Sequence, residues 1–150
     1  MTLSIVIPAF NEEMRIIPTL ESLRDDFIKN KSDIEILVGD DGSIDGTVRV
    51  VNEFARTNTW CRLIKRVKNR GKGAILRELV AESKGDIVLY TDADLPVNPL
   101  SFNQLIDPLL SGKADLVQVS RWLEDSPKVA NVPVHRNIIS QLFRLVTQKM

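Results

Sequence analysis

The chain has 150 residues, of which 43% are hydrophobic and 27% are charged, and its formal net charge is zero. This length and composition predict one globular domain with a real hydrophobic core. The lack of a basic excess and the low aromatic content argue against a nucleic-acid-binding protein. A single cysteine, Cys61, excludes an internal disulfide and a thiolate cluster, and a single histidine, His135, excludes a histidine cluster for zinc.

The first elements along the chain are a strand and a helix. The apolar run Leu3–Ile7 predicts the strand, and residues 8–13 follow as a loop. Pro18 suits the first turn of a helix, so we expect the helix to start near Ile17. The alternative is one longer helix from Asn11 with a kink at Pro18.

Strands and helices continue to alternate after this point. The run Ile34–Val38 predicts a second strand, and the turn cluster at 39–47 leads into a helix with Asp45 or Ser43 as its N-cap. The elements expected after that helix are a strand at 62–66, a glycine turn at 69–73, a helix closed by Gly85, a strand at 87–90, a helix after Pro99, a strand at 115–120 and an amphipathic helix from Ile138.

This alternation predicts an α/β fold of three layers, α/β/α, with a mostly parallel sheet. Right-handed crossovers then bring the carboxyl ends of the strands to one edge of the sheet. Polar segments collect at that edge: the loop after the first strand, Asp40 and Asp41 after the second, and Asp92 and Asp94 after the fourth. Arg121, after the fifth strand, is a further candidate.

Asp92 and Asp94 directly follow the apolar run 87–90. Carboxylates at the end of a buried strand are costly unless a cation or hydrogen bonds satisfy them. Such a pair suits a hard divalent cation whose shell is completed by substrate phosphates. With Asp41 accepting hydrogen bonds from a base or ribose, these parts suit transfer of a group away from a nucleoside diphosphate. The alternative for each acidic segment is a simple turn.

Other features have ordinary explanations. The glycines Gly71 and Gly73 can simply turn the chain, and Lys72 can be a solvated charge. Arg121 can contact an anion only if it folds over the site. The last helix is a core or partner helix, or it lies at a membrane interface through its basic face.

Taken in order, four motifs resemble those of inverting glycosyltransferases of the GT-A fold. They are Ile5–Glu12, Val38–Thr47 with its Asp-Asp-Gly-Ser core, Asn69-x-Gly71-x-Gly73, and Asp92-Ala93-Asp94-Leu95. The continuation Ser120–Leu123, with Arg136, Ile139, Ser140 and Phe143 after it, is similar to dolichyl- or polyprenyl-phosphate sugar synthases.

The resemblance implies residue roles and a division of the chain. Asp92 and Asp94 would hold Mg²⁺ or Mn²⁺ and, with Arg121, form the catalytic set. Residues 1–121 would form the donor domain, 122–136 a mobile cover, and 137–150 the start of an amphipathic helix. The residues implied to bind the nucleotide sugar are Pro8, Ala9, Phe10, Glu12, Gly39, Asp41, Lys72, Asp92, Ala93 and Asp94.

The implied reaction moves a sugar from UDP-glucose or GDP-mannose to a polyprenyl or dolichyl phosphate, with inversion. No signal peptide or membrane-spanning run is visible, so we expect a protein of the cytosol or of a cytosolic membrane face. Pro96 stands where some relatives have glutamine. The family continues beyond this length, so we expect a truncated chain with weak or no transferase activity, because a misplaced acceptor reacts slowly.

Two further hypotheses belong to other classes of protein. One is a non-catalytic nucleotide-binding or interaction module. The other is a receiver-type phospho-acceptor domain, which needs acids after the first strand, where this chain has Pro8-Ala9-Phe10.

Overall fold

The computed structural model describes residues 2–28 and 33–119, and a compact unit extends from Met1 to Val117. Its strands are β1 (Leu3–Ala9), β2 (Ile34–Asp40), β3 (Cys61–Lys65) and β4 (Ile87–Tyr90). Its helices are α1 (Ile16–Leu23), α2 (Thr47–Thr57), α3 (Lys72–Glu82) and α4 (Phe102–Leu110), with short helical turns η1 (Arg24–Ile28) and η2 (Pro99–Ser101).

The strands form one parallel sheet of order β3-β2-β1-β4. The central strand β1 is buried along its whole length, with Leu3 beside Ile34 on one side and beside Ile87 on the other. The chain moves outward from β1 to β2 and β3, then returns to place β4 on the opposite side of β1. The order of strands therefore reverses at β1, and ligands of open α/β sheets bind at such a switch point.

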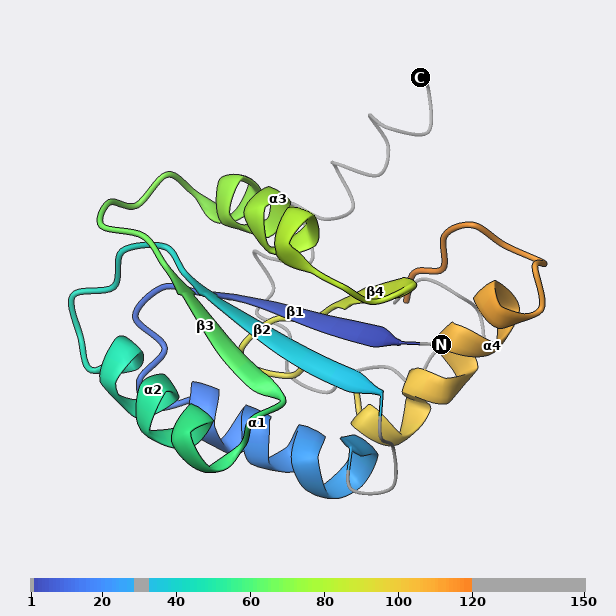
Figure 1. Cartoon of the computed structure of the whole chain (residues 1–150), viewed down its shortest axis with the longest axis horizontal. Helices are drawn as coiled ribbons and strands as arrows, with labels where there is room; N and C mark the ends of the chain where they lie inside the picture. Colours follow the sequence, from blue (N-terminus) through green and yellow to red (C-terminus); the bar gives the residue numbers. More distant parts are fainter. Residues whose placement is uncertain (1, 29–32, 120–150) are drawn as a thin grey trace, which may run out of the picture. The chain divides into compact units, whose positions relative to one another are not determined.

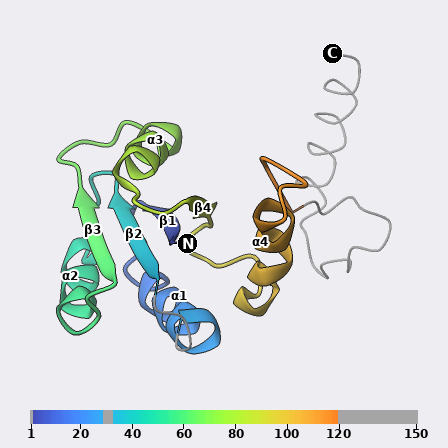
Figure 2. The ribbon, with the colours of Figure 1, turned by 45° about the vertical axis from the view of Figure 1, so that its right-hand side comes forward.

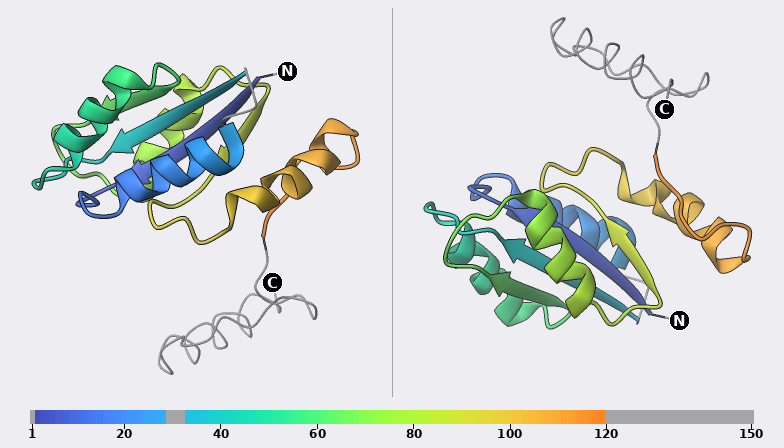
Figure 3. Two further views of the ribbon diagram at one scale, coloured as in Figure 1. Left: turned by 90° about the horizontal axis from the view of Figure 1, so that it is seen from below. Right: turned by 90° about the horizontal axis from the view of Figure 1, so that it is seen from above.

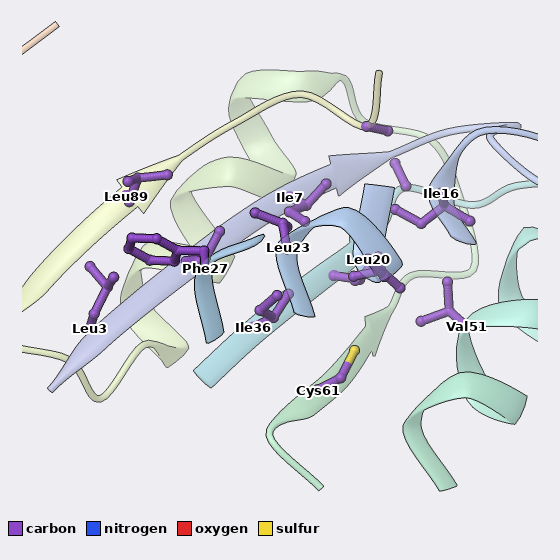
Figure 4. Close-up of a cluster of buried hydrophobic side chains, with 14 of the residues drawn as sticks. Leu3, Ile7, Ile16, Leu20, Leu23, Phe27, Ile36, Val51, Cys61 and Leu89 are labelled. Carbon is purple, nitrogen blue, oxygen red and sulfur yellow. The ribbon is translucent and has the colours of Figure 1, made fainter. Parts of the chain in front are cut away.

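Helices cover both faces of the sheet, as predicted. In Figure 1, α3 lies above the sheet, whereas α1 and α2 lie below it, and the views in Figures 2 and 3 agree. Side chains alternate along β1, because successive residues of a strand point to opposite faces. Ile5 and Ile7 pack in the larger core cluster with Leu20 of α1, part of which Figure 4 shows. Val6 packs in a second cluster with Ile75 of α3.

The first helix begins at Ile16, one residue before the predicted start, with Pro18 in its first turn. The alternative of one long helix from Asn11 is wrong. Asn11 has a φ of 56°, which lies outside the right-handed helical region. The segment between β1 and α1 is therefore an irregular loop, and this loop contributes to the site described below.

Three local predictions need correction. The N-cap of helix α2 is Gly46 and not Asp45 or Ser43, because the helix begins at Thr47. Asp45 directly precedes this N-cap and accepts a hydrogen bond from the Thr47 N–H at 3.0 Å. The predicted strand at 115–120 is absent from its described part, because residues 115–119 pair with no other strand and Leu116 is largely exposed.

The third correction concerns Gly85, which does not end helix α3. That helix ends at Glu82 with Ser83 as its C-cap. A Cβ atom on Gly85 would lie 2.5 Å from the backbone nitrogen of Ser4, so glycine here permits close approach to β1. Residues 120–150, with Arg121, His135, the predicted loop 122–136 and the predicted helix 137–150, lie outside the described residues. Within the described part, no helix is both long and apolar enough to cross a bilayer.

Candidate functional site

A cavity of about 350 Å³ lies at the carboxyl edge of the sheet, at the switch point between β1 and β4. Its walls come from the ends of β1, β2 and β4 and from the β3–α3 loop. The lining residues are Pro8, Ala9, Phe10, Glu12, Arg15, Asp41, Asn69, Lys72, Ile75, Asp92, Ala93 and Asp94. The predicted convergence of polar segments at this edge is thus present in the structure.

Asp92 is held by two donors from neighbouring elements. Its Oδ1 atom accepts hydrogen bonds from Lys72 Nζ and from Tyr90 Oη, each at 2.5 Å. Partial burial alone would raise the pKa of Asp92, but the bonds from Lys72 and Tyr90 outweigh it, so the pKa is lowered. Burial likewise opposes the charge on Lys72, yet its contact with Asp92 raises the pKa of the ammonium group. The pair is therefore ionised at neutral pH.

The turn that carries both aspartates is pinned to the core. Ala93 is buried, and its carbonyl accepts a hydrogen bond from Thr19 Oγ1 of α1 at 2.6 Å. Leu95, after the pair, has a φ of 46°, and its N–H donates to the Asp92 carbonyl at 3.1 Å. Asp94 is exposed and makes no hydrogen bond or ion pair with any described residue. The turn thus presents a free carboxylate to the cavity from a fixed backbone.

These two carboxylates fit a divalent cation in part. Among the described residues, neither oxygen of Asp94 has a partner, and Asp92 retains Oδ2, whereas its Oδ1 is engaged. Oxygen donors of this type suit Mg²⁺ or Mn²⁺. No group of three or more histidine, cysteine or acidic side chains within residues 2–28 and 33–119 is arranged to hold a metal. A cation here would therefore need ligand oxygens, such as phosphate, to complete its shell.

Asp41 supports the opposite wall of the cavity. It is 2% exposed, and its carboxylate accepts hydrogen bonds from the N–H groups of Arg70 and Gly71, the latter at 2.7 Å. Arg66 Nη1 lies 3.3 Å from Asp41 Oδ1. Both carboxylate oxygens are thus already engaged by the β3–α3 loop, and Asp41 fixes the position of that loop.

The loops after β1 and β2 are joined to each other. The Asn11 N–H donates to Ser43 Oγ at 2.9 Å, and Asn11 Oδ1 accepts from the Ile44 N–H at 3.0 Å. Glu13 accepts a hydrogen bond from the Gly46 N–H at 2.9 Å and pairs with Arg49 of α2. These bonds explain the loop conformation, because distant side chains satisfy the free N–H groups near the start of α2.

Glu12 brings an incompletely satisfied carboxylate to the cavity. Its Oε2 atom is buried and has no hydrogen-bond partner among the described residues, although Arg15 Nη1 lies 3.2 Å away. Arg15 and Glu12 thus form an ion pair, but their atoms are not aligned for a hydrogen bond. Glu12 therefore lines the cavity with a carboxylate whose buried Oε2 is balanced by the charge of Arg15 and not by a hydrogen bond.

Nine of the ten residues that the resemblance implies for the nucleotide sugar line the cavity; the exception is Gly39. Gly39 lies in β2 beneath α3, where a Cβ would come within 2.7 Å of Ile75. Arg121 lies outside the described residues. Arg15, Asn69 and Ile75 also line the cavity, and Tyr90 holds Asp92. Of these four residues, only Asn69 belonged to a motif singled out in the sequence, the glycine turn at 69–73.

The chain was compared with known families and proteins. The family model described as glycosyl transferase family 2 matches residues 4–149. A dolichyl-phosphate beta-glucosyltransferase of Dictyostelium discoideum is 33% identical over 99% of this chain and 49% of its own length. The chain spans about half the length of the curated relatives that it matches.

Two solved structures resemble the chain closely enough to identify the fold. The mannosyltransferase PcManGT from Pyrobaculum calidifontis, solved with GDP-Man and Mn²⁺, is 27% identical with a TM-score of 0.61, over 71% of this chain and 32% of its own. Glucosyl-3-phosphoglycerate synthase from Mycobacterium tuberculosis, solved with Mn²⁺, UDP and phosphoglyceric acid, is 31% identical with a TM-score of 0.56, over 73% of this chain and 39% of its own. The expected GT-A fold is confirmed.

Proposed function

Because the chain belongs to glycosyl transferase family 2, we propose that it binds a nucleotide-sugar donor in the cavity between β1 and β4. The observation that carries the proposal is the Asp94 carboxylate, which has no partner among the described residues and lines that cavity together with Asp92. Relatives of the same fold solved with Mn²⁺ and GDP-Man or UDP support this assignment.

In this proposal the two sides of the cavity have different roles. Pro8, Phe10 and Glu12 line the nucleotide side, where the Glu12 carboxylate accepts a hydrogen bond from a ribose or base. Asp92 and Asp94 form the diphosphate side and hold Mg²⁺ or Mn²⁺. When bound, the cation stabilises negative charge on the diphosphate. Lys72 lies on the same side and supplies a further positive charge.

The reaction that we propose for this donor is transfer of its sugar to a polyprenyl or dolichyl phosphate, with inversion. A phosphate oxygen of the acceptor forms a bond to the anomeric carbon as the bond from that carbon to the diphosphate oxygen breaks, and the diphosphate leaves with the electron pair. A phosphate monoester has its second pKa near about 6. The acceptor is therefore already largely ionised at neutral pH and needs little help from a general base. This acceptor class is supported by the relative from Dictyostelium discoideum, which is named a dolichyl-phosphate beta-glucosyltransferase.

Isothermal titration calorimetry tests the donor site. The 150-residue chain is titrated with UDP and with GDP, each with and without Mn²⁺. We expect Mn²⁺-dependent binding of one nucleotide, and loss of that dependence in Asp94→Ala. Asp107→Ala, which removes an exposed aspartate from α4, is the matched control. Equal binding by Asp94→Ala and wild type would contradict the assignment.

A second assay separates transfer from binding. The chain is incubated with Mn²⁺, the preferred nucleotide sugar and polyprenyl phosphate, and the lipid product is measured. Release of a glycosylated lipid phosphate supports the transferase. Nucleotide binding without product supports the alternative of a non-catalytic nucleotide-binding module.

A further inference from the structure

Three loops at the carboxyl edge each expose a large apolar side chain. Met14 in the β1–α1 loop is 85% exposed, Ile44 in the β2–α2 loop 91%, and Val67 in the β3–α3 loop 98%. Apolar side chains exposed to this extent bury nothing in the unit described, so they do not stabilise the fold. Three of them on adjacent loops indicate a contact surface.

The three loops form one continuous edge. The Asn11–Ser43 hydrogen bond joins the first loop to the second. The second meets the third at Gly42, where an added Cβ would lie 2.8 Å from the backbone nitrogen of Asn69. In Figure 1 the blue, teal and green loops lie together at the left end of the sheet, and the views in Figure 3 agree. The three exposed apolar side chains therefore belong to loops at the same end of the sheet.

Basic side chains surround the tip of the third loop. The segment 65–72 reads Lys-Arg-Val-Lys-Asn-Arg-Gly-Lys and contains no acidic residue. Arg66 and Lys72 are engaged by acidic partners. The side chains of Lys65, Lys68 and Arg70 are exposed and make no hydrogen bond or ion pair with other described residues.

Acidic side chains of the same loops offset only part of this charge. Glu13 pairs with Arg49 of α2. Asp45 is exposed and bonded to neutral groups of Thr47, so it keeps its negative charge beside Ile44. Against it stand the three basic side chains of the third loop, which have no acidic partner among the described residues. Exposed apolar side chains flanked by free cations are the pattern of a surface that lies against anionic lipid headgroups.

We infer that this edge, formed by Met14, Ile44 and Val67 with Lys65, Lys68 and Arg70, docks on a bilayer surface that contains anionic lipid. The apolar side chains would enter the headgroup region while the cations meet lipid phosphates and carboxylates. A nucleic-acid partner fits less well, since none of the six residues is aromatic and base stacking needs an aromatic surface. The inference goes beyond the proposed function and does not require nucleotide binding.

Vesicle co-sedimentation tests the surface. The chain is mixed with vesicles of phosphatidylcholine alone and of phosphatidylcholine with phosphatidylserine, at low and high salt. We expect binding to the mixed vesicles that weakens with salt. The triple variant M14S/I44S/V67S is expected to lose at least about tenfold in affinity. The variant K65Q/K68Q/R70Q is expected to lose on the order of 5-fold for each charge removed.

The control L100S/L110S removes two exposed leucines near the ends of α4 and should bind like wild type. Circular dichroism and thermal unfolding show whether each variant folds, and Mn²⁺–nucleotide calorimetry tests the donor site separately. Failure of wild type to bind the mixed vesicles, or equal binding by the triple serine variant, would overturn the inference. Tighter binding to single-stranded RNA than to vesicles would also overturn it and identify the basic loop as a nucleic-acid surface.

Discussion

Lys72 Nζ lies 2.5 Å from Asp92 Oδ1, although the two residues are separated by 20 positions in the sequence. Lys72 is at the start of α3 and Asp92 follows β4, so the pair joins two elements on the diphosphate side of the cavity. The ammonium group occupies an oxygen that a divalent cation would otherwise reach. Lys72 and the cation are therefore expected to compete for Asp92 in the absence of a nucleotide.

Substituting Lys72 by Met should strengthen binding of Mn²⁺ alone, because it removes this competing charge. The expected gain is about 2–5-fold, as for a partly exposed ion pair. The same variant should bind the complex of Mn²⁺ with nucleotide more weakly than wild type, because the positive charge that would contact the diphosphate has been removed. Calorimetry with Mn²⁺, then with Mn²⁺ and nucleotide, measures both. Lys68→Met removes an equal charge nearby and should change neither; weaker binding of Mn²⁺ alone by Lys72→Met would show that the pair does not compete.

Asp41→Ala should destabilise the fold whether or not a ligand is present. It would leave the Arg70 N–H without its acceptor, the Gly71 N–H with only Asn69 Oδ1, and Arg66 without one of its two acidic partners. Because Arg66 keeps Glu78, the expected loss is about 1–3 kcal/mol, the cost of leaving a buried donor without its acceptor. Urea denaturation measures the change in free energy of unfolding, with Asp107→Ala as the exposed comparison. An Asp41→Ala variant as stable as wild type would show that the loop does not depend on this carboxylate.

Gly85→Ala should lower the free energy of unfolding by about 1–3 kcal/mol, because the new methyl group would press on the backbone of β1. Gly73 provides a matched control within α3, since nothing lies within 4 Å of its added Cβ. Gly73→Ala should leave stability unchanged or raise it by up to about 1 kcal/mol. The two variants differ only in the site of the added methyl group. Equal stability of the two proteins would refute the close approach of Gly85 to Ser4.

Cys61 should lower the free energy of unfolding as the pH becomes alkaline. Burial raises the pKa of its thiol to about 12, whereas the thiol of the unfolded chain titrates near about 8.5. Between these values the folded state keeps a proton that the unfolded state has lost, so stability falls as the pH rises above about 9. Cys61→Val should show a shallower decline in urea midpoint between neutral and alkaline pH. Parallel declines in the two proteins would rule out a contribution from Cys61.

Periodicity and turn residues sufficed to predict the sheet, its covering helices and the meeting of Asp41, Asp92 and Asp94 at one edge. These features depend on local patterns and on the handedness of crossovers, which a sequence displays. The bonds that hold Asp92 were not predictable. The one from Lys72 depends on how α3 packs on β1 and β2, and the one from Tyr90 depends on the conformation of the turn after β4. The close approach of Gly85 to Ser4 was not predictable either, because it also depends on how segments distant in the sequence pack together. The strand predicted at 115–120 had β-forming residues, but pairing and packing with a neighbouring strand decide whether such a run becomes a strand.

The bonds between the β1 and β2 loops have a consequence for ligand recognition. Asn11 and Glu13 attach the first loop to the second before any ligand arrives, so the nucleotide side needs no ordering on binding. Asp94, on the other side, has no such restraint on its side chain. A ligand should therefore meet one rigid wall and one adaptable wall, and rigidity lowers the entropy lost on association. A nucleotide without its sugar should therefore bind with an affinity close to that of the nucleotide sugar. The sugar would bind on the side of Asp94, where the protein side chain is less restrained.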